Sequence, residues 1–238
     1  NMNFCQIDEL AAEVGPFDFI LADLGVSSMQ IDNPERGFTY KNDGPLDLRL
    51  NPEAGISAAE RLAGLDKASL IGMLIENADE PYADSIAKQI VNTQKRQPIK
   101  TTRQLHEVVA KALQRVKLPS EVQERVGYST KKQEAARDEL IKKSSARVFQ
   151  ALRIDVNHEY EVLYEFMEKL PGALAPGGRA AILTFHSGED RIVKKAFKAF
   201  HQLGEYSDIA ADVIRPGREE CYQNSRAHST KLRWAIKA

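Results

Sequence analysis

Two short apolar runs, each ending in polar residues, constrain the fold of this chain more than any other feature. The run FDFILA covers residues 17–22, and the run AAILTF covers residues 180–185. Both have the length and continuous apolar character of strands buried on both faces of a parallel sheet. Ligand sites in open α/β sheets lie beyond the carboxyl ends of the strands. If the two strands are neighbours, we expect their polar ends to share one crevice.

The polar residues that follow these runs are candidate site residues. Asp23 ends the first run, and Ser27 and Ser28 come shortly after it, whereas His186 and Ser187 follow the second run. Each has a structural alternative, because Asp and Ser often cap helices and turns and a histidine is often hydrogen-bonded in a core. Both interpretations stay open on these residues alone.

A long helical segment separates the two strands. Residues 57–147 follow a helical pattern throughout, and within 104–113 the apolar side chains share one face. Thr101 and Gln104 have the spacing of a capping box at the start of that helix. The sequence therefore predicts an α/β fold with a helical insertion after the first strand. Further expected elements are helices over 8–14, 148–170 and 188–200, a turn at 176–178, and a closing pair of strands over 209–214 and 231–237.

The helical segment carries an excess of positive charge. Between residues 86 and 147 there are 15 Lys and Arg against 6 Asp and Glu, although the whole chain has 33 and 34. Such an excess indicates a surface that contacts phosphates, and we nominate Lys95, Arg96, Lys100 and Arg103 for it. The alternative is an ordinary solvated helical face.

Composition excludes several classes of protein. With 42% hydrophobic and 28% charged residues, the chain has the composition of a soluble globular protein. No apolar run approaches the roughly 20 residues of a membrane span, and no signal-peptide pattern opens the sequence. Cys5 and Cys221 share no motif, which favours a reducing, cytoplasmic setting. The five histidines lack zinc-site spacing, and no nucleophile elbow precedes His186, so we expect neither a metal site nor a hydrolase triad.

A longer pattern resembles a known family. The stretch DLGVSSMQIDNPERGFTYKNDGPLDLRL at 23–50 is similar to the signature of the RsmH (MraW) family. The resemblance continues, in order, through 82–109, 149–159, 174–198 and 224–233. Members are S-adenosylmethionine-dependent methyltransferases that modify the N4 amine of a cytidine in the decoding site of 16S ribosomal RNA. The resemblance therefore implies a Rossmann-like class I methyltransferase core with an inserted all-helical domain.

The resemblance also implies roles for individual residues. Phe4 matches the position that packs near the adenine of the cofactor, Asp23 matches the acidic residue beside its methionine part, and Gln30 matches a further cofactor contact. The implied cofactor is S-adenosyl-L-methionine, and the implied partner is 16S rRNA within the small ribosomal subunit. A homodimer is one open alternative for the oligomeric state.

The expected domains follow from the same resemblance. In the family, a glycine-rich strand and loop and a second strand precede the position of Phe4, near which this sequence starts. We therefore expect a core without its N-terminal strands, formed by residues 1–44 and 146–238, around a helical insertion at 45–145. Two alternatives to the methyltransferase remain: a cofactor-free RNA-binding fragment of such an enzyme, and an unrelated α/β enzyme acting on a small phosphorylated substrate.

Methylation of a cytosine amine places specific demands on a site. The N4 lone pair is delocalised into the ring, so alignment of nitrogen, methyl and sulfur supplies much of the rate. An acceptor for an N–H of the amine helps the nitrogen rehybridise, and Asp23, a nearby backbone carbonyl and Ser27 are candidates. A base turned out of its stack needs an aromatic partner, for which Phe38, Tyr40 and His186 are candidates.

The loop NDGPLDLR at 42–49 carries a further group of charged residues. Asp43, Asp47 and Arg49 are its ionisable members. They either order a lid over the site or form local turn and ion-pair structure, and we weigh the two interpretations equally.

Overall fold

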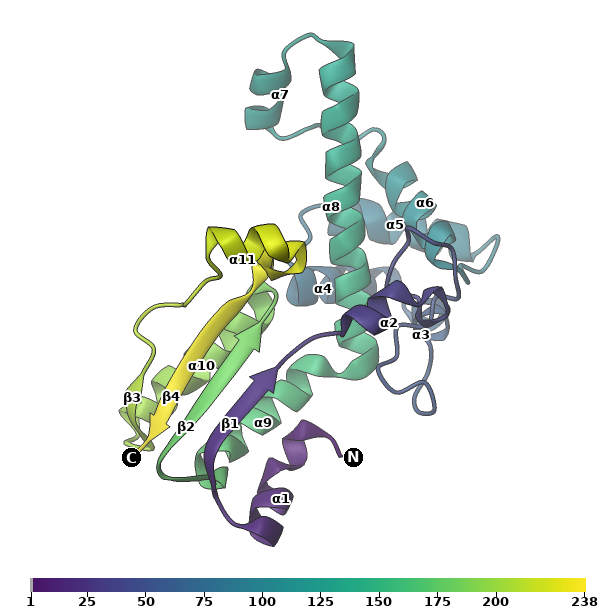
Figure 1. Cartoon of the computed structure of the whole chain (residues 1–238). Coiled ribbons are helices and arrows are strands. Elements are labelled where there is room, and N and C mark those ends of the chain that lie inside the picture. The colour runs from purple at the N-terminus through teal and green to yellow at the C-terminus, as the bar shows by residue number, and fades with distance from the viewer. Residues whose placement is uncertain (1) are drawn as a thin grey trace. The chain divides into compact units, whose positions relative to one another are not determined.

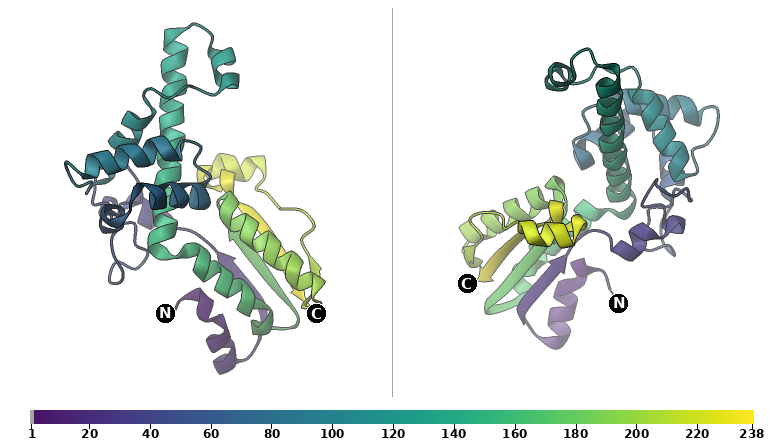
Figure 2. Two further views of the ribbon diagram at one scale, coloured as in Figure 1. Left: turned by 180° about the vertical axis from the view of Figure 1, so that it is seen from behind. Right: turned by 45° about the horizontal axis from the view of Figure 1, so that its top comes forward.

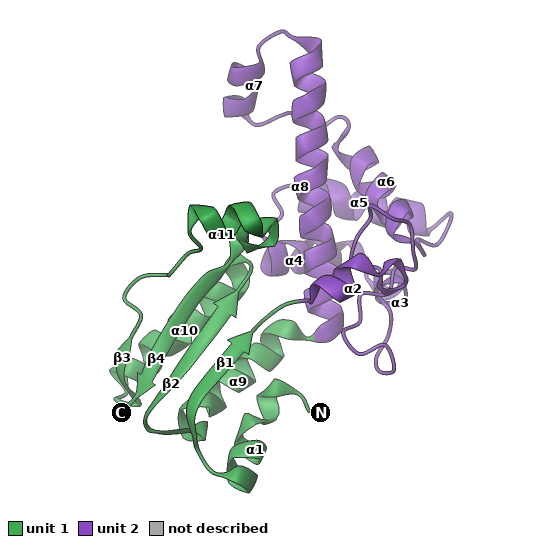
Figure 3. Cartoon of the chain, in the orientation of Figure 1, with its two compact units in different colours: residues 1–25, 158–238 green, residues 26–157 purple. Residues whose placement is uncertain are grey.

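The protein is described by a computed structural model of residues 2–238, and these form two compact units (Figure 3). The sheet unit consists of the chain up to Gly25 together with His158–Ala238. The helical unit consists of Val26–Asn157 and interrupts the sheet unit in sequence. It is wider at both ends than the 45–145 expected from the sequence.

The sheet unit contains all four strands of the described chain, and Figure 1 labels its elements. Its elements are η1 (Phe4–Gln6), α1 (Ile7–Val14), β1 (Phe17–Asp23), α9 (Glu159–Ala173), β2 (Leu174–Thr184), α10 (Ser187–Gln202), β3 (Tyr206–Ile209), α11 (Arg218–Gln223), η3 (Ser225–Ser229) and β4 (Lys231–Lys237).

The strands form one mixed sheet in the order β1-β2-β4-β3. The pair β1–β2 is parallel, whereas β4 runs antiparallel to both β2 and β3. The two apolar runs are therefore neighbouring strands, as the predicted site requires. The predicted strand over 209–214 is wrong in its position, because β3 ends at Ile209 and Ile214 makes only an isolated bridge with Leu232.

One face of this sheet carries the core of the unit. The view from behind in Figure 2 shows α9 and α10 lying along that face. Ala180 and Ile182 of β2 point into it, and they are almost completely buried. Large side chains from the helices, Phe166 and Met167 of α9 and Phe197 of α10, pack with them in one cluster. Burial of these apolar groups is the main stabilising term for the unit.

The opposite face of the sheet is open at β1. Phe19 is 58% exposed and Leu21 is 57% exposed. Leu21 pairs in register with Ala181, which pairs with Trp234, so these three side chains share the open face. The expectation that the first strand is buried on both faces is wrong. A continuous apolar run indicates a strand that can be covered twice, but β1 is an edge strand whose only partner in residues 2–238 is β2.

The predicted turn at 176–178 is a bulge inside β2. The register with β1 jumps from Phe17–Leu174 to Phe19–Arg179. Gly177 has a positive φ of 75°, which favours glycine. A Cβ on Gly178 would lie 2.8 Å from the backbone oxygen of Phe17. Because the two glycines allow this bulge, β2 begins at Leu174, before the bulge, whereas the predicted strand begins at residue 180, after it.

The helical unit contains no strand within the described chain. Its core joins Leu70 and Leu74 to Ile86 and Leu105, all almost completely buried, and the long helix α8 packs across α4 and α6. Its elements are α2 (Ser28–Asp32), η2 (Pro34–Arg36), α3 (Ala58–Gly64), α4 (Lys67–Ala78), α5 (Ala83–Gln94), α6 (Thr102–Leu113), α7 (Ser120–Val126) and α8 (Thr130–Asn157).

The loop before α3 belongs to the helical unit because it is bonded to the start of α6. Leu46 is 1% exposed, and its N–H donates to the carbonyl of Lys100 at 2.9 Å. The N–H of Thr102 donates to the carbonyl of Gly44 at 3.0 Å. The unit therefore begins well before residue 45.

The predicted helix over 148–170 is two helices. α8 ends at Asn157, and α9 begins at Glu159. His158 between them has a φ of 52°, in the left-handed region. That conformation breaks the helix although no Gly or Pro marks the position. The break coincides with the boundary between the two units.

Gly44 is a position where a single methyl group should destabilise the helical unit. A Cβ there would overlap the carbonyl oxygen of Pro34. We expect Gly44→Ala to lower the free energy of unfolding by about 1–3 kcal/mol, measured by urea unfolding followed by circular dichroism. Gly64→Ala is the matched control, because nothing lies within 4 Å of its Cβ position. Equal stability of the two variants would show that this loop does not brace the unit.

Candidate functional site

The polar ends of β1 and β2 lie side by side in the sheet unit. Asp23 is the register partner of Leu183, and the N–H of Leu24 donates to the carbonyl of Leu183 at 3.1 Å. His186 follows Leu183 by three residues. This edge of the sheet is where α/β proteins bind their ligands.

Asp23 is exposed at this edge. It lies on the same face of β1 as Phe19 and Leu21, which are also exposed. Within residues 2–238, its carboxylate makes no hydrogen bond or ion pair. The carboxylate is therefore available to a ligand, and the crevice that we expected around it stays a prediction.

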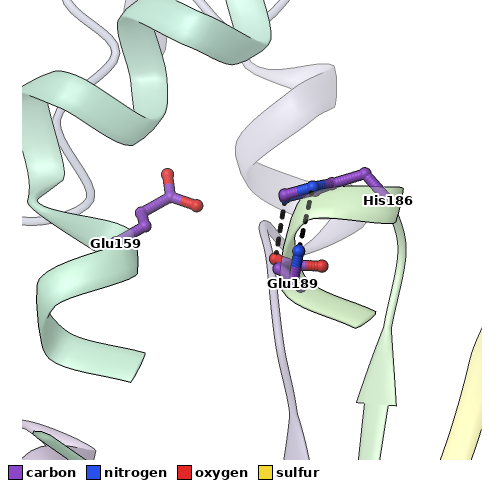
Figure 4. A group of neighbouring side chains, drawn as sticks. All are labelled: Glu159, His186 and Glu189. Carbon is purple, nitrogen blue, oxygen red and sulfur yellow. Dashed lines mark hydrogen bonds and ion pairs between the residues drawn. The ribbon is translucent and has the colours of Figure 1, made fainter. Parts of the chain in front are cut away.

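His186 is held at the N-terminus of α10 by Glu189 (Figure 4). Its Nδ1 accepts from the N–H of Glu189 at 3.4 Å, and its Nε2 lies 3.1 Å from Oε1 of the same carboxylate. A neutral ring must then carry its proton on Nε2. The side chain is 12% exposed. Both ring nitrogens thus face Glu189, so His186 is a helix cap, and its catalytic and base-stacking roles stay predictions.

Glu189 is the buried member of this cluster. It is 3% exposed, and its Oε2 accepts from the N–H of Phe185 at 2.9 Å. Glu159 completes the group, since one ligand atom from each of the three residues lies within 4.8 Å of the others. One histidine and two carboxylates suit a divalent transition metal. We attribute the cluster to capping, because one oxygen of Glu189 already faces Nε2 of His186 and the other accepts from the N–H of Phe185.

Phe4 packs against α9. Its ring meets Phe166 edge to face, with 5.1 Å between ring centroids, and it remains 42% exposed. Lys169 ties the same segment to α9 by donating to the carbonyl of Cys5 at 3.0 Å. Burial and the neighbouring Glu165 raise the pKa of the Cys5 thiol. The result is a positioned aromatic ring that is partly open to a ligand.

Ser27 and Gln30 form a capping box in the helical unit. The Ser27 hydroxyl accepts from the N–H of Gln30 at 3.3 Å, and Oε1 of Gln30 accepts from the N–H of Ser27 at 2.9 Å. Ser28 is the first residue of the short helix α2. The structural alternative for Ser27 is therefore present, and the amide nitrogen of Gln30 is left for a ligand.

The aromatic candidates of the helical unit already have partners. Tyr40 stacks on His106 with 4.3 Å between ring centroids and an interplanar angle of 3°. His106 is fixed in turn by Ser145, 2.8 Å from its Nδ1, and burial lowers the pKa of His106. Phe38 lies under the guanidinium of Arg36 at 5.7 Å. Stacking of an RNA base on Tyr40 or Phe38 stays a prediction.

The charged loop residues form local structure. Arg49 binds both oxygens of Asp47, with a closest distance of 2.7 Å, and this pairing holds the pKa of Asp47 below its ordinary value. Asp43 accepts from the N–H of Arg103 at 3.1 Å, and hydrogen bonds from Thr101 and Arg103 lower its pKa. The local interpretation is thus observed, whereas a role in a lid stays a prediction.

The nominated basic residues are exposed in the helical unit. The side chains of Lys95, Arg96, Lys100 and Arg103 make no salt bridge in the described chain, although the backbone N–H of Arg103 donates to Asp43. Lys95 and Arg96 line a cavity of about 480 Å³ together with Lys111. Sequence reasoning missed Lys111, which lies on α6, about two turns after Arg103. No helix in residues 2–238 has the length and apolar character needed to span a membrane.

Comparisons with known proteins all indicate one family of methyltransferases. The model of the family described as the MraW methylase family matches residues 1–238. A protein of Agathobacter rectalis named ribosomal RNA small subunit methyltransferase H 1 is 62% identical over 99% of this chain and 63% of its own length. A protein of the same name from Lachnoclostridium phytofermentans is 59% identical over 100% of this chain and 61% of its own length.

A more distant relative matches as well. The ribosomal RNA small subunit methyltransferase H of Thioalkalivibrio sulfidiphilus is 38% identical over 97% of this chain and 71% of its own length. The chain therefore spans about three fifths of the length of the two more similar relatives.

Glu189 should be the residue on which the start of α10 depends. Glu189→Ala removes the acceptor of the Phe185 N–H and the partner of His186. We expect a loss of about 1–3 kcal/mol in the free energy of unfolding, because a buried donor loses its partner. Glu168→Ala, on the exposed side of α9, should change stability by about 0.5 kcal/mol or less. Urea unfolding of both variants checks this, and an unaffected Glu189 variant would contradict the capping role.

Proposed function

Because this chain belongs to the MraW methylase family, we propose that it transfers a methyl group from S-adenosyl-L-methionine to the exocyclic N4 amine of a cytidine in the decoding region of 16S rRNA. One observation carries this proposal: the 62% identity, over 99% of the chain, to a protein named as a small-subunit rRNA methyltransferase. The adjacent polar ends of β1 and β2 support it, since this edge is the ligand side of an α/β sheet.

We propose that the sheet unit is a Rossmann-like class I methyltransferase core and that the helical unit is an insertion in it. The open edge of β1 supports the idea that such a core has further strands. An unpaired edge strand with exposed Phe19 and Leu21 is a surface on which strands and helices can add. A glycine-rich cofactor loop would then lie beside Asp23.

Three residues would hold the cofactor. The partly exposed ring of Phe4 offers an apolar surface to the adenine. The unpaired carboxylate of Asp23 suits the ammonium group of the methionine part, and the free amide nitrogen of Gln30 can donate a further hydrogen bond. The bound cofactor supplies an electrophilic methyl group on a sulfonium sulfur.

The protein's contribution to the chemistry is positioning. Holding the cytosine amine in line with the methyl group removes much of the entropic barrier. Asp23, a neighbouring backbone carbonyl or Ser27 accepts an N–H of the amine while its lone pair turns toward the methyl. The product nitrogen loses its proton readily to solvent, so this mechanism needs no strong base.

The RNA would lie on the basic part of the helical unit. Lys95, Arg96, Lys100 and Arg103 are exposed, and their side chains make no salt bridge in residues 2–238, which leaves them available to phosphates. The corresponding partner is the small ribosomal subunit, and the corresponding location is the cytoplasm. A homodimer stays a separate prediction.

A second function is favoured by the exposure of Asp23. A carboxylate on an open surface holds a cofactor less well than one in a crevice. The chain could then act as a cofactor-free RNA-binding module that uses the helical unit alone. This alternative predicts salt-dependent RNA binding without affinity for S-adenosylmethionine.

Asp23→Ala tests the proposed site. We expect loss of about 100-fold or more in methyl transfer, with little change in stability, because the residue lies at an exposed strand end. Incorporation of labelled methyl groups into small-subunit RNA measures the effect. Asp18→Ala is the matched control, since Asp18 is an exposed residue near the other end of β1. Near-normal transfer by the Asp23 variant would remove this residue from the site.

A further inference from the structure

The basic pocket is the cavity of about 480 Å³ at the end of α5, and it faces α6 within the helical unit. We propose that it binds a backbone phosphate of single-stranded RNA and that the cavity adjoining it holds the attached base. This inference rests on the proposed function and adds to it a defined nucleotide subsite. The polar side chains of the basic pocket include Gln89, Asn92, Lys95, Arg96, Gln97 and Lys111.

Three cations converge on the basic pocket from two helices. Lys95 and Arg96 follow the last residue of α5, whereas Lys111 projects from α6. No acidic residue lines this cavity, and none of the three pairs with a carboxylate in residues 2–238. The end of α5 carries the negative pole of its helix dipole, so anion binding here must come from the side-chain cations. Three unpaired cations around one cavity suit a phosphodiester.

Some uncharged side chains of the basic pocket are already hydrogen-bonded within the protein, and others are available to a ligand. Thr93 is satisfied inside α5, since its hydroxyl donates to the carbonyl of Gln89 at 2.9 Å and receives a hydrogen bond from the Gln89 amide at 3.3 Å. The side-chain amides of Asn92 and Gln97 have no hydrogen-bond partner in the described chain. They can therefore donate to a phosphate or to ribose hydroxyls.

A second cavity of about 290 Å³ continues the basic pocket. It shares Gln97 and Lys111 with that pocket, so the two form one groove. Ile99 and Val108, only 2% and 7% exposed, give it an apolar floor. Glu107 lines this second cavity. Its carboxylate repels phosphate, but it can accept a hydrogen bond from the amino group of a base. The groove is thus polarised, with phosphate at one end and base at the other.

Residues 95–99 form one wall of the groove, and hydrogen bonds hold this segment at both ends. Oε1 of Gln94 accepts from the N–H of Ile99 at 3.1 Å. The carbonyl of Lys100 accepts from the N–H of Leu46 at 2.9 Å. Residues 95–99 are therefore fixed before a ligand arrives, which lowers the entropy cost of binding.

The surroundings favour a polymer over a small phosphorylated molecule. Lys100 directly follows residues 95–99, and Arg103 lies in the first turn of α6. Both are exposed, and neither side chain makes a salt bridge in the described chain. These cations extend the positive surface beyond the volume of one nucleotide. A chain of phosphates can contact them at the same time, whereas a lone phosphate cannot.

The experiment is fluorescence anisotropy with a labelled single-stranded RNA of roughly 12 nucleotides, without cofactor. The pair Lys95→Ala and Lys111→Ala removes two charges from the pocket, and the pair Lys131→Ala and Lys132→Ala removes two from the exposed start of α8. We expect about a tenfold loss of affinity for the pocket pair and a salt slope reduced by about 0.7, the value for one phosphate contact on a single strand. The control pair should lose about threefold or less.

Gln97→Ala separates a built site from general electrostatics. The change is uncharged, so the salt slope should stay the same while affinity falls about fivefold, the value of one hydrogen bond. Equal losses for the two lysine pairs, or an unaffected Gln97 variant, would overturn the pocket. If cytidine monophosphate binds the pocket and the RNA does not, the claim that the ligand is an RNA chain is wrong.

Failure of the subsite and failure of the proposed function have different signatures. If RNA binding depends on the pocket but no methyl transfer occurs, the subsite stands and the methyltransferase function falls. If methyl transfer occurs and the pocket pair binds RNA normally, the function stands and the subsite is refuted. Thermal unfolding of each variant verifies that these exposed substitutions leave the fold intact.

Discussion

The parallel pairing of β1 with β2 is the constraint on which the rest of the structure depends. Its register places Asp23 opposite Leu183, so the polar ends of two strands separated by about 160 residues of chain meet at one edge. A slip of one residue would move Phe19, Leu21 and Asp23 to the other face of the sheet. The bulge at Gly177 and Gly178 defines where that register begins. The proposed chemistry therefore depends on backbone geometry before it depends on any side chain.

The two units divide the work in this account. The sheet unit presents a carboxylate at a strand end and a partly exposed Phe4, as binding of a sulfonium cofactor requires. The helical unit has its own core and carries the unpaired cations, as binding of RNA requires. His186, which the sequence nominates for catalysis, lies against the buried Glu189 and caps the start of α10, and its catalytic role stays a prediction.

Local chemistry was the predictable part. The capping box of Thr101 and Gln104 and the two apolar strands follow from residue type and spacing, and both are present. That the two strands are neighbours was a condition of the predicted site and not a consequence of the pattern. What failed depends on tertiary context. An apolar run does not reveal how many neighbours a strand has, so the exposure of β1 was missed. The break at His158 carries no Gly or Pro signal. Lys111 joins the basic pocket only because α6 packs against α5, and sequence spacing does not show this.

Calorimetric titration of this chain with S-adenosylmethionine tests the central claim most directly. The claim is that the adjoining ends of β1 and β2 form part of a cofactor site. The account predicts saturable heat with one cofactor bound per chain. Absence of heat, while the same sample still binds single-stranded RNA, would contradict it and would leave the helical unit as an RNA-binding module on a core without cofactor.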